Sequence, residues 1–309
     1  MTQFIFDELT GTPTVLATNR VRRTDQTGAV SSDTQKKFSG AAPVCYFCKG
    51  NENLTPSTLY KDADDWNVRV FKNAFPIVDD HEVIVHSPFH DKDLNDLPND
   101  QVIRYIRALL NRVNYYTTQG KEVLIINNRG GKAGASILHP HSQILALAGF
   151  PGIIEMEKHA ALTYYNEKDS CFWCDMLIKE ARDIKRVVAE TQHFIVIVPN
   201  ASRWSYETIL IPKTHRPNFE YINEIEISDF ANLIRAVCFA YDDLLNKPDR
   251  NFWMHTQRFD PYHWHMGFIP HTKVLGGLEL GAGIWVSDRA TPEDAAQQLG
   301  ERVKKFLSL

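Results

Sequence analysis

The 309-residue sequence lacks several features that would place it in a broad class of proteins. No apolar run approaches the roughly 18 uninterrupted residues that a membrane-spanning helix needs. It has no basic run or acidic tail, and its net charge is only −4, so nothing in it favours binding to nucleic acid or to a membrane surface. The first residues also lack the basic start and apolar core of a signal peptide. We therefore expect a cytoplasmic protein with neither a nucleic-acid nor a membrane partner.

Cysteine is scarce, and its placement is informative. Four of the five cysteines form two Cys-x-x-Cys pairs, Cys45 with Cys48 and Cys171 with Cys174. The fifth, Cys238, stands in an apolar stretch and is expected in the core. In a reducing compartment such pairs are more often metal ligands or redox centres than disulfides. No thioredoxin-like pattern surrounds either pair, which favours metal binding.

The two halves of the chain carry the same landmarks in the same order. From the second cysteine of each pair to the next marked histidine there are 42 residues in the first half (48 to 90) and 41 in the second (174 to 215). From there to a His-x-His pair there are 49 residues (90 to 139) and 48 (215 to 263). The length also fits two domains of about 150 residues. We predict a tandem duplication, with domains 1–155 and 156–309.

Each half has the pattern of one α+β unit. Apolar runs predict strands over 66–71, 81–86 and 123–128 in the first half, and over 193–200, 207–215 and 252–255 in the second. Apolar residues at helical spacing predict helices over 100–116, capped by Asn99, and over 228–245. The predicted fold class is therefore α+β, with two duplicated units of mostly antiparallel sheet and packed helices.

The segment 139–143, His-Pro-His-Ser-Gln, is the most unusual in the chain. Side chains alternate along an extended strand, so His139, His141 and Gln143 would project from one face. Apolar residues flank the segment on both sides. The pattern predicts a functional site, and the alternative is a surface strand that carries polar residues by chance.

The cysteine pairs and the marked histidines form two equivalent sets of candidate metal ligands. Zinc prefers four soft or borderline ligands in a tetrahedron. The first set is Cys45, Cys48, His90 and His139, and its copy is Cys171, Cys174, His215 and His263. We predict two closed, structural zinc sites per chain. The alternative is two unliganded pairs, with the histidines hydrogen-bonded in the core.

Taken together, these motifs resemble those of the galactose-1-phosphate uridylyltransferase family, which carries two units of the histidine-triad superfamily in tandem. The resemblance rests on segments 45–52, 70–76, 81–90, 128–143, 212–215 and 277–279, with His-Pro-His-x-Gln as the most specific motif. The second cysteine pair and segment 276–285 are more similar to the ADP-glucose phosphorylase type. The resemblance implies histidine-triad-like domains and a homodimer.

The resemblance also implies a ping-pong nucleotidyl transfer. His141 would attack the α-phosphorus of a nucleoside diphosphate sugar and hold the nucleoside monophosphate as a phosphoramidate until a sugar phosphate or phosphate removes it. A neutral imidazole, with an ordinary pKa of about 6.5, is nucleophilic near pH 7 without a separate base. Gln143 and Ser136 would donate hydrogen bonds to the phosphates. His139, bound to the metal, would hold the segment in place.

Other side chains are assigned to substrate binding. Arg20 and Arg23 would offset phosphate charge, and Asn73 and Asn128 would lie near the nucleoside. Glu279 is assigned by resemblance alone. Trp285 stands where the uridylyltransferase pattern has a sugar-contacting glutamine, so galactose is not assigned as the sugar; base and acceptor also stay open.

The second metal site has an alternative ligand set. In the uridylyltransferase type that metal can be held by a glutamate and three histidines, and Glu157, His255, His263 and His265 could take this role, with iron in place of zinc. Both sets claim His263, and the otherwise unexplained cysteine pair favours the cysteine set. His265 repeats the position of His141, but no glutamine follows it at the spacing of Gln143, so we expect catalysis in the first domain only.

Two other functions stay open. A dinucleoside polyphosphate phosphorylase or hydrolase would use the same chemistry at His141. A zinc-stabilised nucleotide-binding module without turnover would not need the pair of His141 and Gln143, which argues against it.

Overall fold

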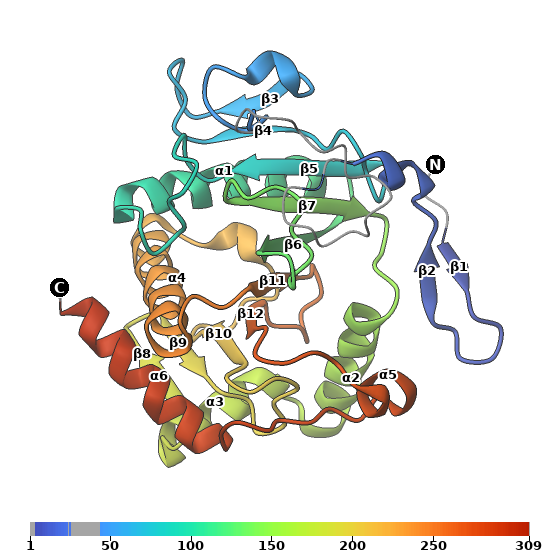
Figure 1. The fold of residues 1–309 in the computed structure, drawn as a ribbon. Coiled ribbons are helices and arrows are strands. Elements are labelled where there is room, and N and C mark those ends of the chain that lie inside the picture. The colour runs from blue at the N-terminus through green and yellow to red at the C-terminus, as the bar shows by residue number, and fades with distance from the viewer. Residues whose placement is uncertain (1–3, 24, 26–43, 309) are drawn as a thin grey trace. The chain divides into compact units, whose positions relative to one another are not determined.

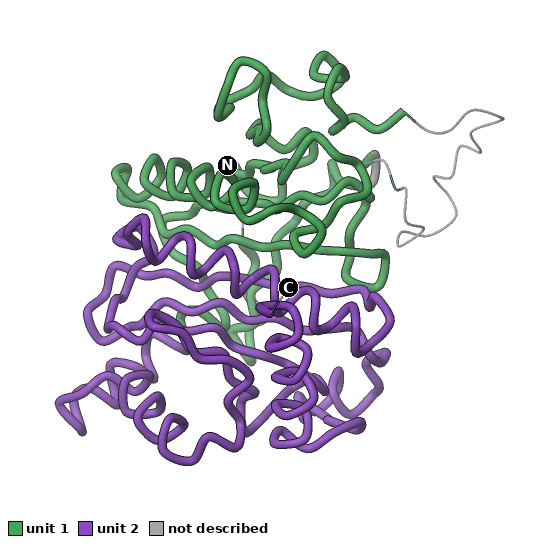
Figure 2. The backbone as a smooth tube through the Cα atoms, turned by 90° about the vertical axis from the view of Figure 1, so that its left-hand side faces the viewer, with its two compact units in different colours: residues 1–156 green, residues 157–309 purple. Residues whose placement is uncertain are grey.

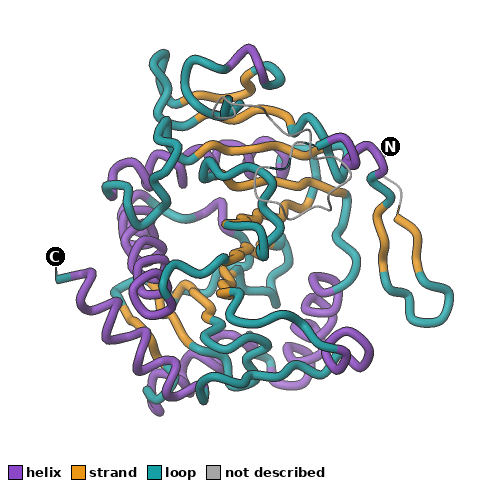
Figure 3. The backbone as a smooth tube through the Cα atoms, viewed as in Figure 1, coloured by secondary structure: helices purple, strands orange, loops and turns teal. Residues whose placement is uncertain are grey.

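The computed structural model describes residues 4–23, 25 and 44–308. The chain divides into two compact units, residues 1–156 and 157–309 (Figure 2). Each unit combines helices with a sheet whose paired strands are antiparallel (Figure 3). The predicted α+β class is confirmed. Among the described residues, no helix has both the length and the apolar character that crossing a bilayer requires.

Unit 1 contains a two-stranded ribbon and a sheet with the strand order β3-β4-β5-β7-β6. The ribbon pairs β1 (Phe4–Phe6) with β2 (Pro13–Val15). The sheet consists of β3 (Thr58–Lys61), β4 (Arg69–Lys72), β5 (Asp80–Val85), β6 (Glu122–Arg129) and β7 (His141–Leu147). Among the described residues of this unit, the helices are the short η1 (Thr18–Arg22) and η3 (Glu52–Leu54) and the long α1 (Asn99–Thr117). Helix α1 packs against β5 and β6 (Figure 1).

Unit 2 repeats this arrangement with the strand order β11-β12-β10-β9-β8. Its strands are β8 (Val187–Glu190), β9 (Phe194–Ile197), β10 (Thr208–Pro212), β11 (Arg250–Thr256) and β12 (His265–Pro270). Helix α2 (Ile153–Lys168) leads into the unit, and α3 (Phe172–Asp183), η4 (Phe219–Tyr221), α4 (Glu224–Leu245), α5 (Gly277–Ala282) and α6 (Pro292–Leu307) follow.

Strand register shows the duplication residue by residue. In unit 1, Val83 pairs with Gln143 on one side and with Phe71 on the other. In unit 2, Ile209 pairs with Gly267 and with Ile197 in the same way. Positions in the two sheets can therefore be compared directly.

Two predicted boundaries are wrong for identifiable reasons. Pro98, not Asn99, is the N-cap of α1, and the backbone carbonyl of Pro98 accepts the first hydrogen bonds, from the N–H groups of residues 101 and 102. Helix α4 begins four residues before the predicted start at 228, because Asn223 and Glu226 form a capping box there.

The segment that carries the predicted functional motif is also divided differently from the prediction. Strand β7 begins at His141, so His139 lies before the strand rather than on its face. Pro140 stands between them and has no N–H to continue the ladder. His141 and Gln143 do share one face of β7. Ser142 points to the opposite face, where its hydroxyl is hydrogen-bonded to His86 and to Tyr105, which lies on α1.

A buried ion pair joins α1 to strand β5 of the sheet. The Arg112 guanidinium donates to both carboxylate oxygens of Glu82, at 2.8 and 2.7 Å, and the Tyr116 hydroxyl donates to the same carboxylate at 2.6 Å.

Because Glu82→Gln leaves the buried Arg112 charge without its counter-charge, we expect the free energy of unfolding to fall by about 3 kcal/mol in urea denaturation. Asp64→Asn, which breaks the exposed pair with Lys61, should leave it unchanged. Equal, small effects of both changes would contradict this account.

Candidate functional site

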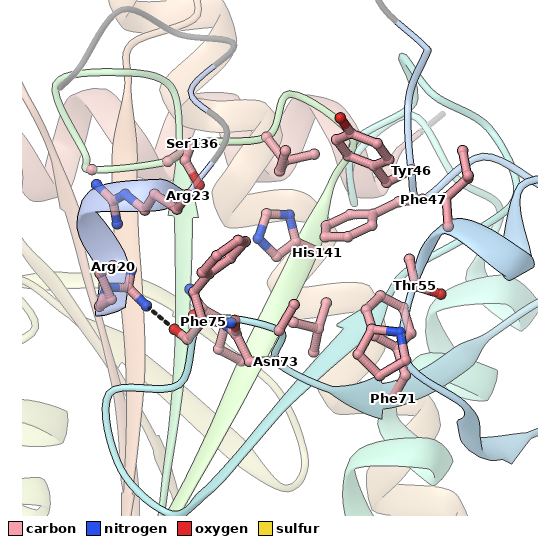
Figure 4. A pocket seen from close by; sticks show the side chains of 18 residues that line it. Arg20, Arg23, Tyr46, Phe47, Thr55, Phe71, Asn73, Phe75, Ser136 and His141 are labelled. Carbon is pink, nitrogen blue, oxygen red and sulfur yellow. Dashed lines mark hydrogen bonds between the residues drawn. The ribbon is translucent and has the colours of Figure 1, made fainter. Parts of the chain in front are cut away.

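A pocket of about 330 Å³ lies in unit 1, on the face of the sheet that carries His141 and Gln143 (Figure 4). Its walls are partly aromatic and partly polar. The aromatic side chains are Tyr46, Phe47, Phe71 and Phe75, and the polar ones are Arg20, Arg23, Thr55, Asn73, Ser136, His141 and Gln143. Such a mixture of ring faces and convergent polar groups suits a ligand with both a flat base and charged groups.

The hydrogen bonds of His141 determine which of its ring nitrogens can react. Its Nδ1 lies 2.8 Å from the backbone carbonyl oxygen of His139. A carbonyl oxygen only accepts, so Nδ1 carries the proton and Nε2 keeps its lone pair. Burial lowers the pKa of His141, which keeps the ring neutral at pH 7. The ring of Phe47 meets it edge-on, with centroids 5.0 Å apart, and restricts its rotation.

Most of the residues predicted for substrate binding line the pocket. Arg20, on η1, donates to the backbone carbonyl oxygen of Phe75 at 2.7 Å, and Arg23 and Ser136 lie nearby (Figure 4). The loop before Ser136 turns at Gly134, whose φ of 81° favours glycine.

Asn128 and Glu279 are placed differently from the other predicted residues. Asn128 is not among the described residues that line the pocket, but extending the register of β6 and β7 by one residue puts it opposite His141 on the same face. Glu279 belongs to unit 2, where it accepts from Lys273 at 2.5 Å and from the backbone N–H of Gly276 at 3.0 Å. Those contacts stabilise the start of α5.

The first predicted metal set is brought together in unit 1. The ligand atoms of Cys45, Cys48, His90 and His139 all lie within 4.8 Å of one another. The sulfur-to-Nδ1 distances are 3.5 to 3.7 Å, and a tetrahedral zinc with ordinary bond lengths separates such atoms by about 3.6 Å. The Nε2 of His139 donates to the backbone carbonyl oxygen of Ser87 at 2.9 Å, which leaves the Nδ1 lone pair directed at the thiols. The residues fit a metal.

The second predicted set has the same geometry in unit 2. Cys171, Cys174, His215 and His263 lie within 4.8 Å of one another, with sulfur-to-Nδ1 distances of 3.4 to 3.9 Å. Both histidines donate through Nε2 to backbone carbonyl oxygens, of Asp260 and Pro212, at 3.0 Å each. This set also fits a metal.

The alternative ligand set forms a separate cluster without His263. Glu157, His255 and His265 gather within 4.8 Å, and the Glu157 carboxylate accepts from His255 Nδ1 at 2.8 Å and from the Tyr262 hydroxyl at 2.7 Å. Because the Nδ1 of His263 faces the cysteines, the two sets do not compete for it. His263 thus belongs to the cysteine set, which the sequence favoured, and the alternative set forms without the fourth ligand that was predicted for it.

In unit 2 the counterparts of His141 and Gln143 have different surroundings. His265 repeats the orientation of His141, with its Nδ1 donating to the backbone carbonyl oxygen of His263 at 3.1 Å, but its ring packs against that of Trp173 at a tilt of 35°, with centroids 4.4 Å apart. At Gly267, the counterpart of Gln143, an added Cβ would lie 2.6 Å from the Trp253 ring. Any side chain there would require that ring to move.

Sequence reasoning missed the importance of His81. It lies on β5 two residues before Val83, on the same face as Gln143, and its Nε2 is 2.8 Å from Gln143 Oε1. The available signal was that His81 stands two residues before Val83, and therefore on the same face of the predicted strand. The aromatic side chains of the pocket were not predicted individually. Phe71 and Phe75 lie in segment 70–76, and Tyr46 and Phe47 lie in segment 45–52, both of which carried the family resemblance.

Comparisons with known proteins give a consistent result. Residues 79–151 match the domain described as galactose-1-phosphate uridyl transferase, N-terminal domain, and residues 157–280 match its C-terminal domain. A galactose-1-phosphate uridylyltransferase of Thermotoga maritima is 29% identical, over 90% of this chain and 96% of that protein. An ADP-glucose phosphorylase of Arabidopsis thaliana is 26% identical, over 83% of this chain and 81% of that protein.

Solved structures share the fold. The crystal structure of an ADP-glucose phosphorylase from Arabidopsis thaliana superposes with a TM-score of 0.77, at 24% identity, over 97% of this chain and 98% of that one. Both domains of one family match in order, and together they cover more than half of the sequence. The chain belongs to the galactose-1-phosphate uridyl transferase family.

Proposed function

We propose that the protein is a nucleotidyltransferase that moves a nucleoside monophosphate from a nucleoside diphosphate sugar to a sugar phosphate or to phosphate. The observation that carries this proposal is the hydrogen bond from His141 Nδ1 to the carbonyl oxygen of His139, which leaves Nε2 as the reactive nitrogen in a pocket shared with Gln143 and two arginines. The relatives are named galactose-1-phosphate uridylyltransferase and ADP-glucose phosphorylase, and both names support the same reaction class.

The proposed reaction has two balanced steps. His141 Nε2 forms a bond to the α-phosphorus, and the bond from that phosphorus to the bridging oxygen breaks, with its electron pair leaving on the sugar phosphate. A phosphate oxygen of the acceptor then attacks the same phosphorus, and the phosphorus–nitrogen bond breaks. Throughout, the proton stays on Nδ1 and is donated to the carbonyl oxygen of His139, which stabilises the positive charge that the ring gains on phosphorylation.

Other pocket residues would bind the anionic parts of the substrate. Arg20 and Arg23 would pair with phosphate oxygens, and Gln143 and Ser136 would donate to the oxygens around the reacting phosphorus. Asn73 would lie toward the nucleoside, with Asn128 beside the nucleophile. The role of Glu279 in substrate binding stays a proposal from family resemblance.

Metals would act structurally in this scheme. Thiolate and imidazole ligands favour zinc at both Cys2His2 sets, and iron is the less suitable ion there. A metal at the first set would hold His139, and through its carbonyl oxygen the orientation of His141. A homodimer and a cytoplasmic location are further proposals that rest on resemblance and on sequence; sedimentation analysis tests the first.

Isotope exchange tests the function. The protein is incubated with UDP-glucose, UDP-galactose or ADP-glucose and the matching labelled hexose 1-phosphate, without a second nucleotide. A ping-pong enzyme transfers label into the nucleotide sugar, because the first half-reaction runs in both directions. A parallel incubation of diadenosine tetraphosphate with phosphate examines the alternative activity on dinucleoside polyphosphates. Binding of nucleotide without exchange or cleavage in any incubation would identify a non-catalytic binding module.

A further inference from the structure

We propose that His81 is a positioning residue, which holds the Gln143 side-chain amide so that its NH₂ group faces the pocket. The proposal rests on the proposed transfer through His141, in which Gln143 donates to the reacting phosphoryl group. It assigns a function to a buried histidine that takes no part in the reaction itself.

The protonation of His81 is determined by its surroundings. The backbone N–H of Ile77 points at His81 Nδ1 from 3.0 Å. A backbone N–H can only donate, so Nδ1 is the acceptor and has no proton. The side chain is 2% exposed, and burial lowers the pKa of His81 to about 4, so the ring is neutral and its single proton is on Nε2.

A backbone N–H also determines the orientation of the Asn73 side-chain amide. The backbone N–H of Phe75 donates to Asn73 Oδ1 at 2.9 Å, so the NH₂ group of Asn73 is at the other end of its amide. That Nδ2 lies 3.2 Å from His81 Nε2 and 3.4 Å from Gln143 Oε1. The backbone N–H of Asn73 also donates to the carbonyl oxygen of His81 at 2.8 Å, which fixes the spacing of the two residues.

Two donors therefore face one end of the Gln143 amide. His81 Nε2 is 2.8 Å from Gln143 Oε1, and the Asn73 amide is slightly farther away. Only the carbonyl oxygen satisfies both, because the reversed amide would bring three donors together without an acceptor. The NH₂ group of Gln143 is then at the opposite end, and Gln143 lines the pocket beside His141.

Unit 2 provides an internal comparison. Extending the register of β10 and β12 by one residue shows that Glu207 occupies the position of His81, and Gly267 occupies that of Gln143. Glu207 accepts from Arg203 at 2.8 Å instead. The unit without the glutamine thus also lacks the histidine that would orient it.

A double-mutant cycle tests the proposal. His81→Leu is expected to lower kcat for exchange about 30-fold with little change in KM, since misplaced catalytic groups typically cost one to two orders of magnitude. In a Gln143→Ala background, the same change should cost less than about 3-fold, because there is no amide left to orient. His81→Gln, whose amide nitrogen reaches the position of Nε2, should retain kcat within about 5-fold. Equal losses from His81→Leu in both backgrounds would overturn the proposal.

A second measurement does not depend on activity. The ¹⁵N chemical shifts of labelled histidine at pH 7 distinguish the two tautomers, and the His81 signals are identified by their loss in His81→Gln. We expect the Nε2–H form; the Nδ1–H form would overturn the proposal. If the wild type shows no exchange with any substrate pair, both the proposed function and the role of His81 in it are wrong. If the wild type is active and the cycle is additive, only the role of His81 fails.

Discussion

His141→Asn should lower the rate of isotope exchange by at least about 10⁴-fold, the size of effect seen when a covalent nucleophile is removed. The substitution is closely matched to the site. An asparagine amide nitrogen falls where Nδ1 was and can still donate to the carbonyl oxygen of His139, whereas no atom occupies the position of Nε2. The loss should therefore appear in kcat, with nucleotide binding retained in equilibrium dialysis.

A histidine that does not line the pocket provides the control for this variant. His271 lies in unit 2, where its Nε2 is 2.6 Å from Asn251 Oδ1. His271→Asn should leave exchange within a few-fold of the wild-type rate. Retention of exchange in His141→Asn, together with its loss in His265→Asn, would show that the nucleophile is His265 of unit 2.

Loss of the metal ion from the first Cys2His2 set should lower stability more than any other change proposed here. Binding of a structural zinc by such ligands contributes about 10 to 16 kcal/mol, which is comparable with the entire stability of a typical domain. We expect Cys48→Ser to remove one metal per chain and to lower the melting temperature by at least about 10 °C. Exchange should fall as well, because His139 supplies both a metal ligand and the carbonyl oxygen that orients His141. Elemental analysis measures the metal content, calorimetry the melting temperature, and the exchange assay the activity of the same samples.

A buried cysteine outside the clusters is the control for the metal experiment. Cys238→Ala, on α4, should keep the wild-type metal content. Unchanged metal content in Cys48→Ser would contradict the assignment. In the wild type, two zinc ions per chain are expected from the two Cys2His2 sets; a third metal would show that Glu157, His255 and His265 also hold an ion.

The sequence allowed the fold class and the repeat to be predicted because both leave marks along the chain itself. Cys-x-x-Cys turns, marked histidines and apolar runs recur at near-constant spacing, and that spacing reflects one architecture used twice. The structure brings the members of both Cys2His2 sets together. Boundaries were less predictable, since the start of α4 depends on the capping box of Asn223 and Glu226.

Features that depend on pairing between distant strands could not be predicted. The contact of His81 with Gln143 follows from the register of β5 against β7, which no local pattern specifies. Similarly, both predicted ligand sets for the second metal claimed His263, and only the structure shows that its Nδ1 faces Cys171 and Cys174. The contact of Trp253 with Gly267 explains the missing glutamine in unit 2, but only the pairing of β11 with β12 reveals it.

The covalent intermediate on His141 is the central claim, and intact-protein mass spectrometry tests it most directly. The wild type is incubated with UDP-glucose or ADP-glucose without an acceptor, and then with the matching hexose 1-phosphate. The account predicts a mass increase of one nucleoside monophosphate group per chain that is acid-labile and alkali-stable, disappears when the acceptor is added, and does not form in His141→Asn. An adduct that forms equally on His141→Asn, or no adduct on a wild type that turns over the same substrate, would contradict it.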